Sequence, residues 1–138
     1  MSAPSHSPTS SVTILFADLC ERHTLYSGVP DRVALESIAD CLEGASTVIA
    51  RAGGNVVRSN GEDLLCTFGV PREALLAGRE LVARQVGQML KLRVGIHFGQ
   101  ATAARGDIFG DAVNMAAHLL SLGRPGDVLV SDAYAVSY

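Results

Sequence analysis

The feature that most restricts the fold is an apolar run, VTILFADLC at residues 12–20, in which β-branched and aromatic side chains are dense. Such a run is typical of a buried strand, and it predicts a strand that ends at Asp18 or soon after. A charged side chain at the end of an apolar strand is costly to bury unless it is paired or bound to a metal ion. Asp18 is therefore a candidate site residue. The alternative is an aspartate that caps the next turn.

The rest of the chain alternates between segments with helical spacing of apolar residues and short runs typical of strands. Gly28, Val29 and Pro30 break the chain before the first helix, for which Asp31 is a plausible cap, and an Asn-Gly turn separates the second and third strands. The predicted helices are residues 31–52, 71–89 and 112–122, with a short one from residue 131. The further predicted strands are residues 55–58, 64–68, 92–98 and 127–130, and residues 106–110 are predicted to form a turn.

This order of elements predicts a single α+β domain with a ferredoxin-like, split βαβ fold, an antiparallel-rich sheet and helices packed on one face. The domain is predicted to span residues 12–138, and the Ser/Pro-rich residues 1–11 are predicted to be a disordered tail. No signal peptide or membrane-length apolar run is recognised, and three dispersed cysteines fit neither a zinc site nor a disulfide framework. A cytoplasmic location is the resulting expectation.

The net charge and the content of charged residues indicate which classes of partner the chain can bind. A net charge of −3 argues against binding to nucleic acid or to an acidic membrane surface, which would require a basic face. Charged residues make up only 18% of the chain. This low content is compatible with a face that a protein partner covers.

The predicted hairpin between the second and third strands carries two carboxylates, Glu62 and Asp63, after Gly61. They would point toward Asp18 if the hairpin strands flank the first strand. Carboxylates that converge repel one another, and a divalent cation such as Mg²⁺ or Mn²⁺ is the usual remedy. The alternative is a solvated hairpin tip.

The segment DIFGDAVNMAAH at residues 107–118 combines a glycine with the start of a helix. Gly110 suits the close approach of a ligand, and Asn114 and His118, four residues apart, share one helix face. Met115, Ala116 and Leu119 are expected to face the core. A polar pair near a helix N-terminus predicts a phosphate or ribose site, whereas an ordinary amphipathic helix is the alternative.

Four stretches, in this order and spacing, resemble the catalytic domain of the class III nucleotide cyclases, the adenylate and guanylate cyclase family. They are VTILFAD at 12–18, GGNVVRSNGE at 53–62, LRVGIHFG at 92–99 and GDAVNMAAHL at 110–119. The resemblance implies a domain that forms a cyclic nucleotide and pyrophosphate from a nucleoside triphosphate. It also implies two Mg²⁺ or Mn²⁺ ions, and a homodimer or a pair of related chains whose sites lie between the subunits.

The resemblance also assigns roles to individual residues. Asp18, Leu19 and Glu62 match the metal positions. Arg58 and Asp107 match the Lys and Asp that read the adenine edge, which implies ATP as the nucleotide. Asn114 and His118 match the catalytic Asn and Arg that orient the ribose and stabilise the phosphate in the transition state.

Several of these positions depart from the family pattern. Glu62 replaces Asp, Arg58 replaces Lys and His118 replaces Arg, while Glu21 stands where a glycine is usual. A later triphosphate-binding Lys has no counterpart, and the segment between Gly99 and Asp107 is short for the family. Two readings follow: an adenylate cyclase of weak activity, and a degenerate cyclase domain that serves as a dimerising, nucleotide-binding or regulatory module. A ferredoxin-like binding domain with no link to nucleotides is a third.

Overall fold

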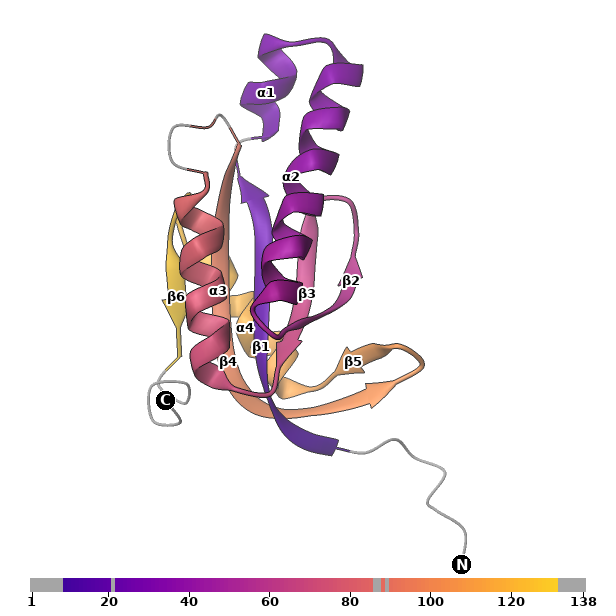
Figure 1. The fold of residues 1–138 in the computed structure, drawn as a ribbon, viewed down its shortest axis with the longest axis vertical. Coiled ribbons are helices and arrows are strands. Elements are labelled where there is room, and N and C mark those ends of the chain that lie inside the picture. Colours follow the sequence, from indigo (N-terminus) through magenta and orange to yellow (C-terminus); the bar gives the residue numbers. More distant parts are fainter. Residues whose placement is uncertain (1–8, 21, 86–87, 89, 132–138) are drawn as a thin grey trace, which may run out of the picture.

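The computed structural model describes residues 9–20, 22–85, 88 and 90–131 as one α+β unit with a central sheet (Figure 1). Its elements are β1 (Thr9–Cys20), α1 (Arg22–Gly28), α2 (Asp31–Arg51), β2 (Asn55–Ser59), β3 (Asp63–Phe68), α3 (Pro71–Ala83), β4 (Lys91–Ala104), β5 (Asp107–Phe109), α4 (Asp111–Leu122) and β6 (Val128–Val130). The predicted α+β class and ferredoxin-like sheet are confirmed.

The sheet has the strand order β2-β3-β1-β4-β5, and β6 pairs in parallel with β4. All other pairings are antiparallel. The apolar β1 therefore lies between β3 and β4, and its residues from Ile14 to Ala17 are buried. This central position places the end of β1, with Asp18, between two neighbouring strands that can each contribute side chains.

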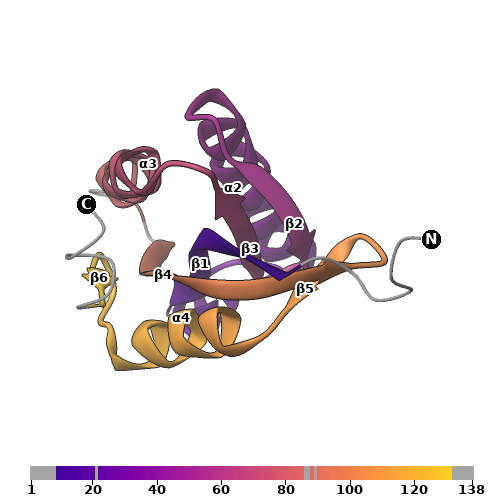
Figure 2. The same ribbon diagram turned by 90° about the horizontal axis from the view of Figure 1, so that it is seen from below.

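The helices cover both faces of the sheet, so the expectation that they pack on one face is wrong. Helices α2 and α3 pack on one side against Leu15, Ala17 and Leu19 of β1. Helix α4 packs on the other side against Ile14 and Phe16 (Figure 2). Alternate residues of β1 thus belong to two separate apolar clusters, because successive side chains of a strand point to opposite faces of the sheet.

Most predicted boundaries hold within a few residues, and the differences have local causes. Strand β1 begins at Thr9, so residues 9–11 belong to the sheet rather than to a tail. Helix α1 was not predicted, since its seven residues are too few to show a helical period. Asp31 does not cap α2: Pro30 holds the cap position, and no side-chain hydrogen bond is made there. Helix α3 ends at Ala83; Met89 and the predicted helix after Ser131 lie outside the described residues.

The turn expected at residues 106–110 is instead the second strand of a hairpin. Strand β5 pairs with Thr102–Ala104 of β4, and Arg105 and Gly106 form the connection with φ angles of 55° and 73°. Two successive positive φ angles are typical of the tight turns that suit a hairpin. An Arg-Gly pair is not among the usual signals for such a turn, which is why the sequence pattern did not reveal it.

Helix α4 lies very close to β4. A Cβ atom on Gly95 would lie 2.6 Å from the carbonyl oxygen of Ala116 and 2.8 Å from the amide nitrogen of Leu120. Only glycine allows this approach, which fixes the helix carrying Asn114 and His118 against the sheet. Among the described helices, none is both long and apolar enough to cross a membrane.

Candidate functional site

Asp18 lies in the last part of β1, directly opposite Asp63 of β3 on one side and Arg93 of β4 on the other. Arg93 donates two hydrogen bonds to it, from Nε to Oδ1 at 2.8 Å and from Nη2 to Oδ2 at 3.1 Å. The side chain of Asp18 is 22% exposed, and that of Arg93 is 27% exposed. The bonds to Asp18 raise the pKa of the Arg93 guanidinium. The negative charge of Asp18 is thus compensated by an ion pair with Arg93. The sequence predicted that Asp18 would be either paired or bound to a metal ion, with a turn cap as the alternative.

The β2–β3 hairpin brings its two carboxylates to the same end of the sheet. The amide of Leu19 donates to the carbonyl oxygen of Glu62 at 3.1 Å, and the Glu62 side chain is exposed. Asp63 is different, because its Oδ1 is buried and has no hydrogen-bond partner. Leu19, which the resemblance places in the metal site, buries its side chain in the core and can offer only its backbone.

The chemistry of this end of the sheet fits a divalent cation. Two aspartates face each other across the strands, one carrying a buried oxygen without a partner, and hard carboxylate oxygens suit Mg²⁺ or Mn²⁺. Within the described residues, no group of three or more His, Cys, Asp or Glu side chains is arranged to hold a metal ion. Any cation held here would therefore rely on two carboxylates, together with backbone, water or phosphate oxygens.

Arg58 and Asp107 meet although they lie 49 residues apart in the chain. Arg58 Nε donates to Asp107 Oδ1 at 3.1 Å, and both side chains are about one-third exposed. The amide of Ile108 donates to the same oxygen at 2.7 Å, which orients the carboxylate. The structure thus joins the two residues that the resemblance assigns to base recognition.

A β-bulge in β2 explains how Arg58 reaches this position. The register shifts between Val56 and Arg58, so that Arg58 pairs with Leu65 instead of Leu64. Leu65 belongs to the apolar cluster under α4, whereas Leu64 belongs to the cluster under α2 and α3. The extra residue therefore turns Arg58 to the α4 face, in keeping with the tendency of bulges to re-aim side chains near functional sites.

Helix α4 presents Asn114 and His118 to solvent on one face. It starts after Gly110, whose φ of 127° is accessible to glycine and strained for other residues. Ala116 faces the core as expected and Leu119 is partly buried, but Met115 is 42% exposed. The core contacts of α4 come from Ala112, Val113, Ala116 and Leu120, so the apolar Met115 lies beside Asn114 on the outer surface. Glu21 lies outside the described residues.

The comparisons with known proteins concern the family and the fold of the chain. A profile of the adenylate and guanylate cyclase catalytic domain matches residues 5–137, nearly the whole chain. The chain belongs to this family.

Three similar proteins illustrate the relationship. This cyclase domain is 33% identical to an adenylate cyclase of Streptomyces coelicolor over 127 residues, which is 87% of the chain but 32% of that protein. A solved adenylate/guanylate cyclase/hydrolase of Silicibacter pomeroyi is 30% identical, with a TM-score of 0.81 over 94% of this chain and 80% of that one. The adenylyl cyclase CyaB of P. aeruginosa has a TM-score of 0.84 at 19% identity, covering 94% and 81%, and supports the fold alone. The cyclase domain thus spans about a third of the length of the first relative.

One residue beside Asp18, Arg93, was not predicted as a member of the site, because it lies in a stretch that indicates only the family. Asp63 was predicted as one of two hairpin carboxylates that could point toward Asp18, although the resemblance assigns the metal position to Glu62. Both Arg93 and Asp63 stand opposite Asp18 in the strand register. The signal that would have found Arg93 is this register, which a single sequence does not supply.

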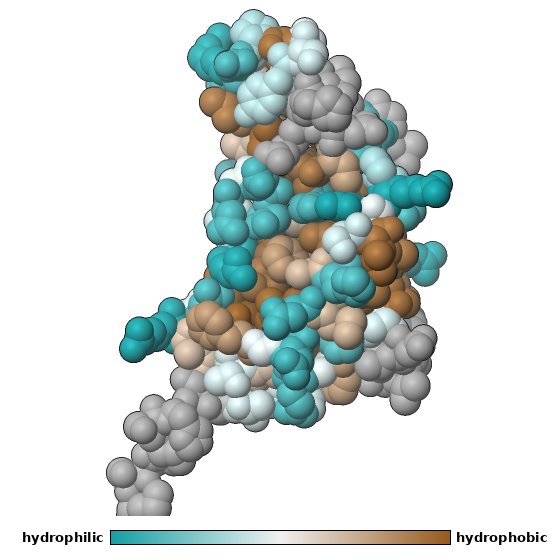
Figure 3. Space-filling model, turned by 180° about the vertical axis from the view of Figure 1, so that it is seen from behind, coloured by the Kyte–Doolittle hydropathy of each residue, from teal (hydrophilic) through white to brown (hydrophobic). Residues whose placement is uncertain are grey.

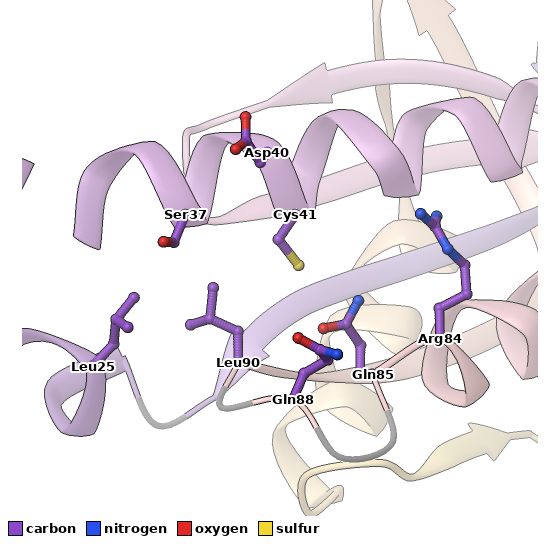
Figure 4. A pocket seen from close by; sticks show the side chains of 8 residues that line it. All are labelled: Leu25, Ser37, Asp40, Cys41, Arg84, Gln85, Gln88 and Leu90. Atoms are coloured by element: carbon purple, nitrogen blue, oxygen red, sulfur yellow. The ribbon is translucent and has the colours of Figure 1, made fainter. Parts of the chain in front are cut away.

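The predicted residues form two groups. Among the described hydrogen bonds and ion pairs, those of Asp18 lead to Arg93 and those of Arg58 to Asp107, and none joins the two groups. A pocket among the described residues lies elsewhere. It has a volume of about 490 Å³ and lies between α1, α2 and the end of α3, with Leu25, Cys41 and Arg84 in its lining (Figure 4). Its lining includes none of the candidate residues of either group.

Proposed function

We propose that this cyclase domain converts ATP to cyclic AMP and pyrophosphate. The observation that carries the proposal is the ion pair between Arg58 and Asp107. Arg58 Nε and the Ile108 amide both bond to Asp107 Oδ1, which leaves Oδ2 to accept from the exocyclic amino group of adenine. The terminal nitrogens of Arg58 can donate to a ring nitrogen of the base. Donor and acceptor side by side match the edge of adenine.

Asn114 and His118 are proposed to act on the ribose and the α-phosphate. Their side chains project from the same exposed face of α4, where they can bond to a nucleotide. In the reaction, the ribose 3′-oxygen forms a bond to the α-phosphorus, its proton is lost, and the bond to pyrophosphate breaks. Asn114 would orient the ribose, and His118 would donate one hydrogen bond to the phosphate oxygens. A single donor predicts slow turnover.

The carboxylates at the end of β1 are proposed to serve a divalent cation, as members of this family generally use. Asp18 and one carboxylate of the hairpin would hold the ion, which when bound supplies Lewis-acid activation of the ribose hydroxyl and neutralises phosphate charge. Arg93 orients the Asp18 carboxylate through its two hydrogen bonds. Each carboxylate oxygen has a second lone pair, so Arg93 and a cation can share Asp18.

We further propose a homodimer, or a pair with a related chain, as the active form. No described hydrogen bond or ion pair joins the two groups of residues within one chain. Helix α4 exposes the apolar side chains Met115 and Leu122, and the face of the molecule seen from behind carries apolar patches (Figure 3). Apolar surface of this kind is common at protein interfaces. A cytoplasmic location, where ATP is available, remains a prediction.

One observation favours the second candidate, a degenerate cyclase domain that binds nucleotide without turnover. Arg93 already engages both oxygens of Asp18, and it neutralises the charge that would attract a cation. In this reading the domain keeps its dimerising surface and its base-binding pair and acts as a regulatory module.

Incubation of the protein with ATP and Mn²⁺, followed by chromatographic separation of the products, tests the first candidate. We expect cyclic AMP from the wild type, none from Asp18→Asn, and less product from GTP. If no cyclic AMP forms while ATP with Mn²⁺ raises the melting temperature, the regulatory module is the better description. Neither product nor thermal shift would contradict both candidates.

A further inference from the structure

The pocket between α1, α2 and the end of α3 has the size of a site for a small molecule. Its volume is about 490 Å³, within the range of roughly 300–1,000 Å³ that such sites occupy. The buried side chains of Leu25 and Leu90 give it an apolar surface. Ser37 and Cys41 point from α2 toward the opposite wall (Figure 4). The pocket therefore offers both apolar and polar contacts to a ligand.

The wall opposite α2 carries two carboxamides. Gln85 and Gln88 extend their side chains toward α2 (Figure 4), and no described hydrogen bond uses either side-chain amide. Each carboxamide has two N–H donors and an acceptor oxygen. A ligand placed between the two walls can therefore receive hydrogen bonds that the described residues do not use among themselves.

The charge around the pocket is positive. Arg84 lies at one end, and no described carboxylate pairs with it. Lys91 donates from Nζ to the carbonyl oxygen of Gln85 at 2.9 Å, which places a second cation beside the wall. Asp40 is the acidic residue of the lining, but its carboxylate points away from the pocket, on the other side of α2 (Figure 4). An anionic ligand suits this arrangement better than a cationic one.

Gly44 holds the guanidinium of Arg84 in place. Arg84 Nη1 donates to the carbonyl oxygen of Gly44 at 2.8 Å, and a Cβ atom on Gly44 would lie 2.9 Å from Arg84 Nη2. Gly44 is in the middle of α2, where glycine costs about 1 kcal/mol relative to alanine. The described hydrogen bond uses one of the five N–H groups of the guanidinium, so the others are available to a ligand.

We propose that this pocket binds a small organic anion, with a carboxylate or phosphate group at Arg84 and a short apolar body against Leu90. The pocket shares no residue with the candidate catalytic groups, so the proposal goes beyond the cyclase reaction. Its walls lead into β1 and β4, because α1 follows β1 and Leu90 precedes β4. A bound anion thus contacts the two segments that lead to the ion pair of Asp18 and Arg93.

Protection of Cys41 from a neutral thiol reagent tests the proposal on the whole chain. The Cys41 thiolate attacks the sulfenyl sulfur of methyl methanethiosulfonate, forms a methyl disulfide and releases methanesulfinate. Burial raises the pKa of the Cys41 thiol, and the smaller effect of Arg84 lowers this pKa, so the reaction is run at alkaline pH. Peptide mass spectrometry follows Cys41, and the fully buried Cys66 reports whether the fold stays intact.

The probes are benzoate and phenyl phosphate, with benzamide and benzylamine as neutral and cationic analogues of similar size. We expect one or both anions at millimolar concentration to slow the modification of Cys41 saturably, by about threefold at twice the Kd. Benzamide and benzylamine should leave the rate unchanged. Protection by benzoate alone would assign a carboxylate ligand, and protection by phenyl phosphate alone would assign a phosphate.

Three variants locate the anion. Arg84→Gln removes the charge from an exposed position and should abolish protection, whereas Arg79→Gln removes an exposed arginine of α3 outside the pocket and should retain it. Gly44→Ala is the second test, because its Cβ displaces the guanidinium. This variant should protect less than the wild type, and it should melt at the same temperature or higher, since alanine favours the helix.

Three results would overturn the proposal. Equal protection by benzamide and benzoate would show that the pocket does not select for charge. Protection that persists in Arg84→Gln would place the anion elsewhere, and no protection by either anion would mean that the pocket does not bind this class of ligand. None of these measurements uses cyclic AMP formation, so the proposal and the proposed function can fail separately.

Discussion

At the scale of single residues, His118 is where the proposed reaction is weakest. A neutral imidazole donates one hydrogen bond, whereas a guanidinium carries a permanent charge and a planar fork that fits phosphate oxygens. His118 is exposed on α4, so a longer side chain can be accommodated there without disturbing the core. Activity, rather than stability, should therefore respond to a change at this position.

We predict that His118→Arg raises kcat for cyclic AMP formation on the order of 10²-fold, the usual value of a preorganised donor to a developing oxyanion. The measurement is the steady-state rate with ATP and Mn²⁺. His118→Lys is the control, since it adds charge without the fork and should gain less. A variant no faster than the wild type would place the limiting defect elsewhere, for instance at Glu62.

His97 is a residue whose titration should make the stability of the domain depend on pH. Partial burial lowers its pKa below 6.5, and its Nδ1 is 2.7 Å from the hydroxyl of Ser131. The folded state then binds fewer protons than the unfolded state as the pH falls below 6.5. The stabilisation is complete above that value and is lost as the pH falls through the lowered pKa.

We predict that the melting temperature of the wild type falls between pH 7.5 and pH 5 more steeply than that of His97→Asn. Asparagine keeps a polar atom near the position of Nδ1 and does not titrate in this range. Thermal denaturation followed by circular dichroism at a series of pH values gives the comparison. Equal slopes for the two proteins would show that His97 does not contribute.

At the scale of elements, the contact between α4 and β4 depends on a missing side chain. A Cβ atom at Gly95 would collide with backbone atoms of α4, which cannot move aside as a flexible side chain can. The helix that carries Asn114 and His118 is therefore held against the sheet by the absence of a single methyl group.

We predict that Gly95→Ala lowers the free energy of unfolding by about 1–3 kcal/mol, as overpacking of a close contact usually does. Urea denaturation measures the change. Gly69→Ala is the matched control, because nothing lies within 4 Å of the position its Cβ would take, and it should stay within about 0.5 kcal/mol of the wild type. A Gly95→Ala protein as stable as this control would contradict the close packing.

The elements themselves were largely predictable, whereas the contacts between them were not. Local patterns located α2, β3 and α4 because periodic apolar residues and turn signals act over a few positions. The pairing of Asp18 with Arg93, 75 residues away, needs the strand register. The meeting of Arg58 with Asp107 needs the bulge in β2, which flips one side chain to the other face. The family resemblance supplied candidate residues, and only the fold showed what each one faces.

At the scale of the whole molecule, one chain holds its candidate residues in two groups that no described hydrogen bond or ion pair connects. Asp18 lies near the end of β1 beside Asp63 of β3, the pair of Arg58 and Asp107 joins β2 to β5, and Asn114 projects from α4. If two copies associate through a two-fold axis, each site receives the cation ligands of one copy and the nucleotide ligands of the other. A defect in one group can then be compensated by the intact group of the partner.

We predict that Asp18→Asn and Asn114→Ala proteins, each inactive alone, recover activity when they are mixed and allowed to exchange subunits. Random pairing makes half of the dimers mixed, each with one intact site out of two, so the mixture should reach about a quarter of the wild-type rate. Native mass spectrometry confirms the mixed dimers, and cyclic AMP formation gives the rate. Mixing Asp18→Asn with Asp18→Ala is the control, because both changes remove the same carboxylate and no intact site can form. Mixed dimers without activity would mean that the two groups act within a single chain.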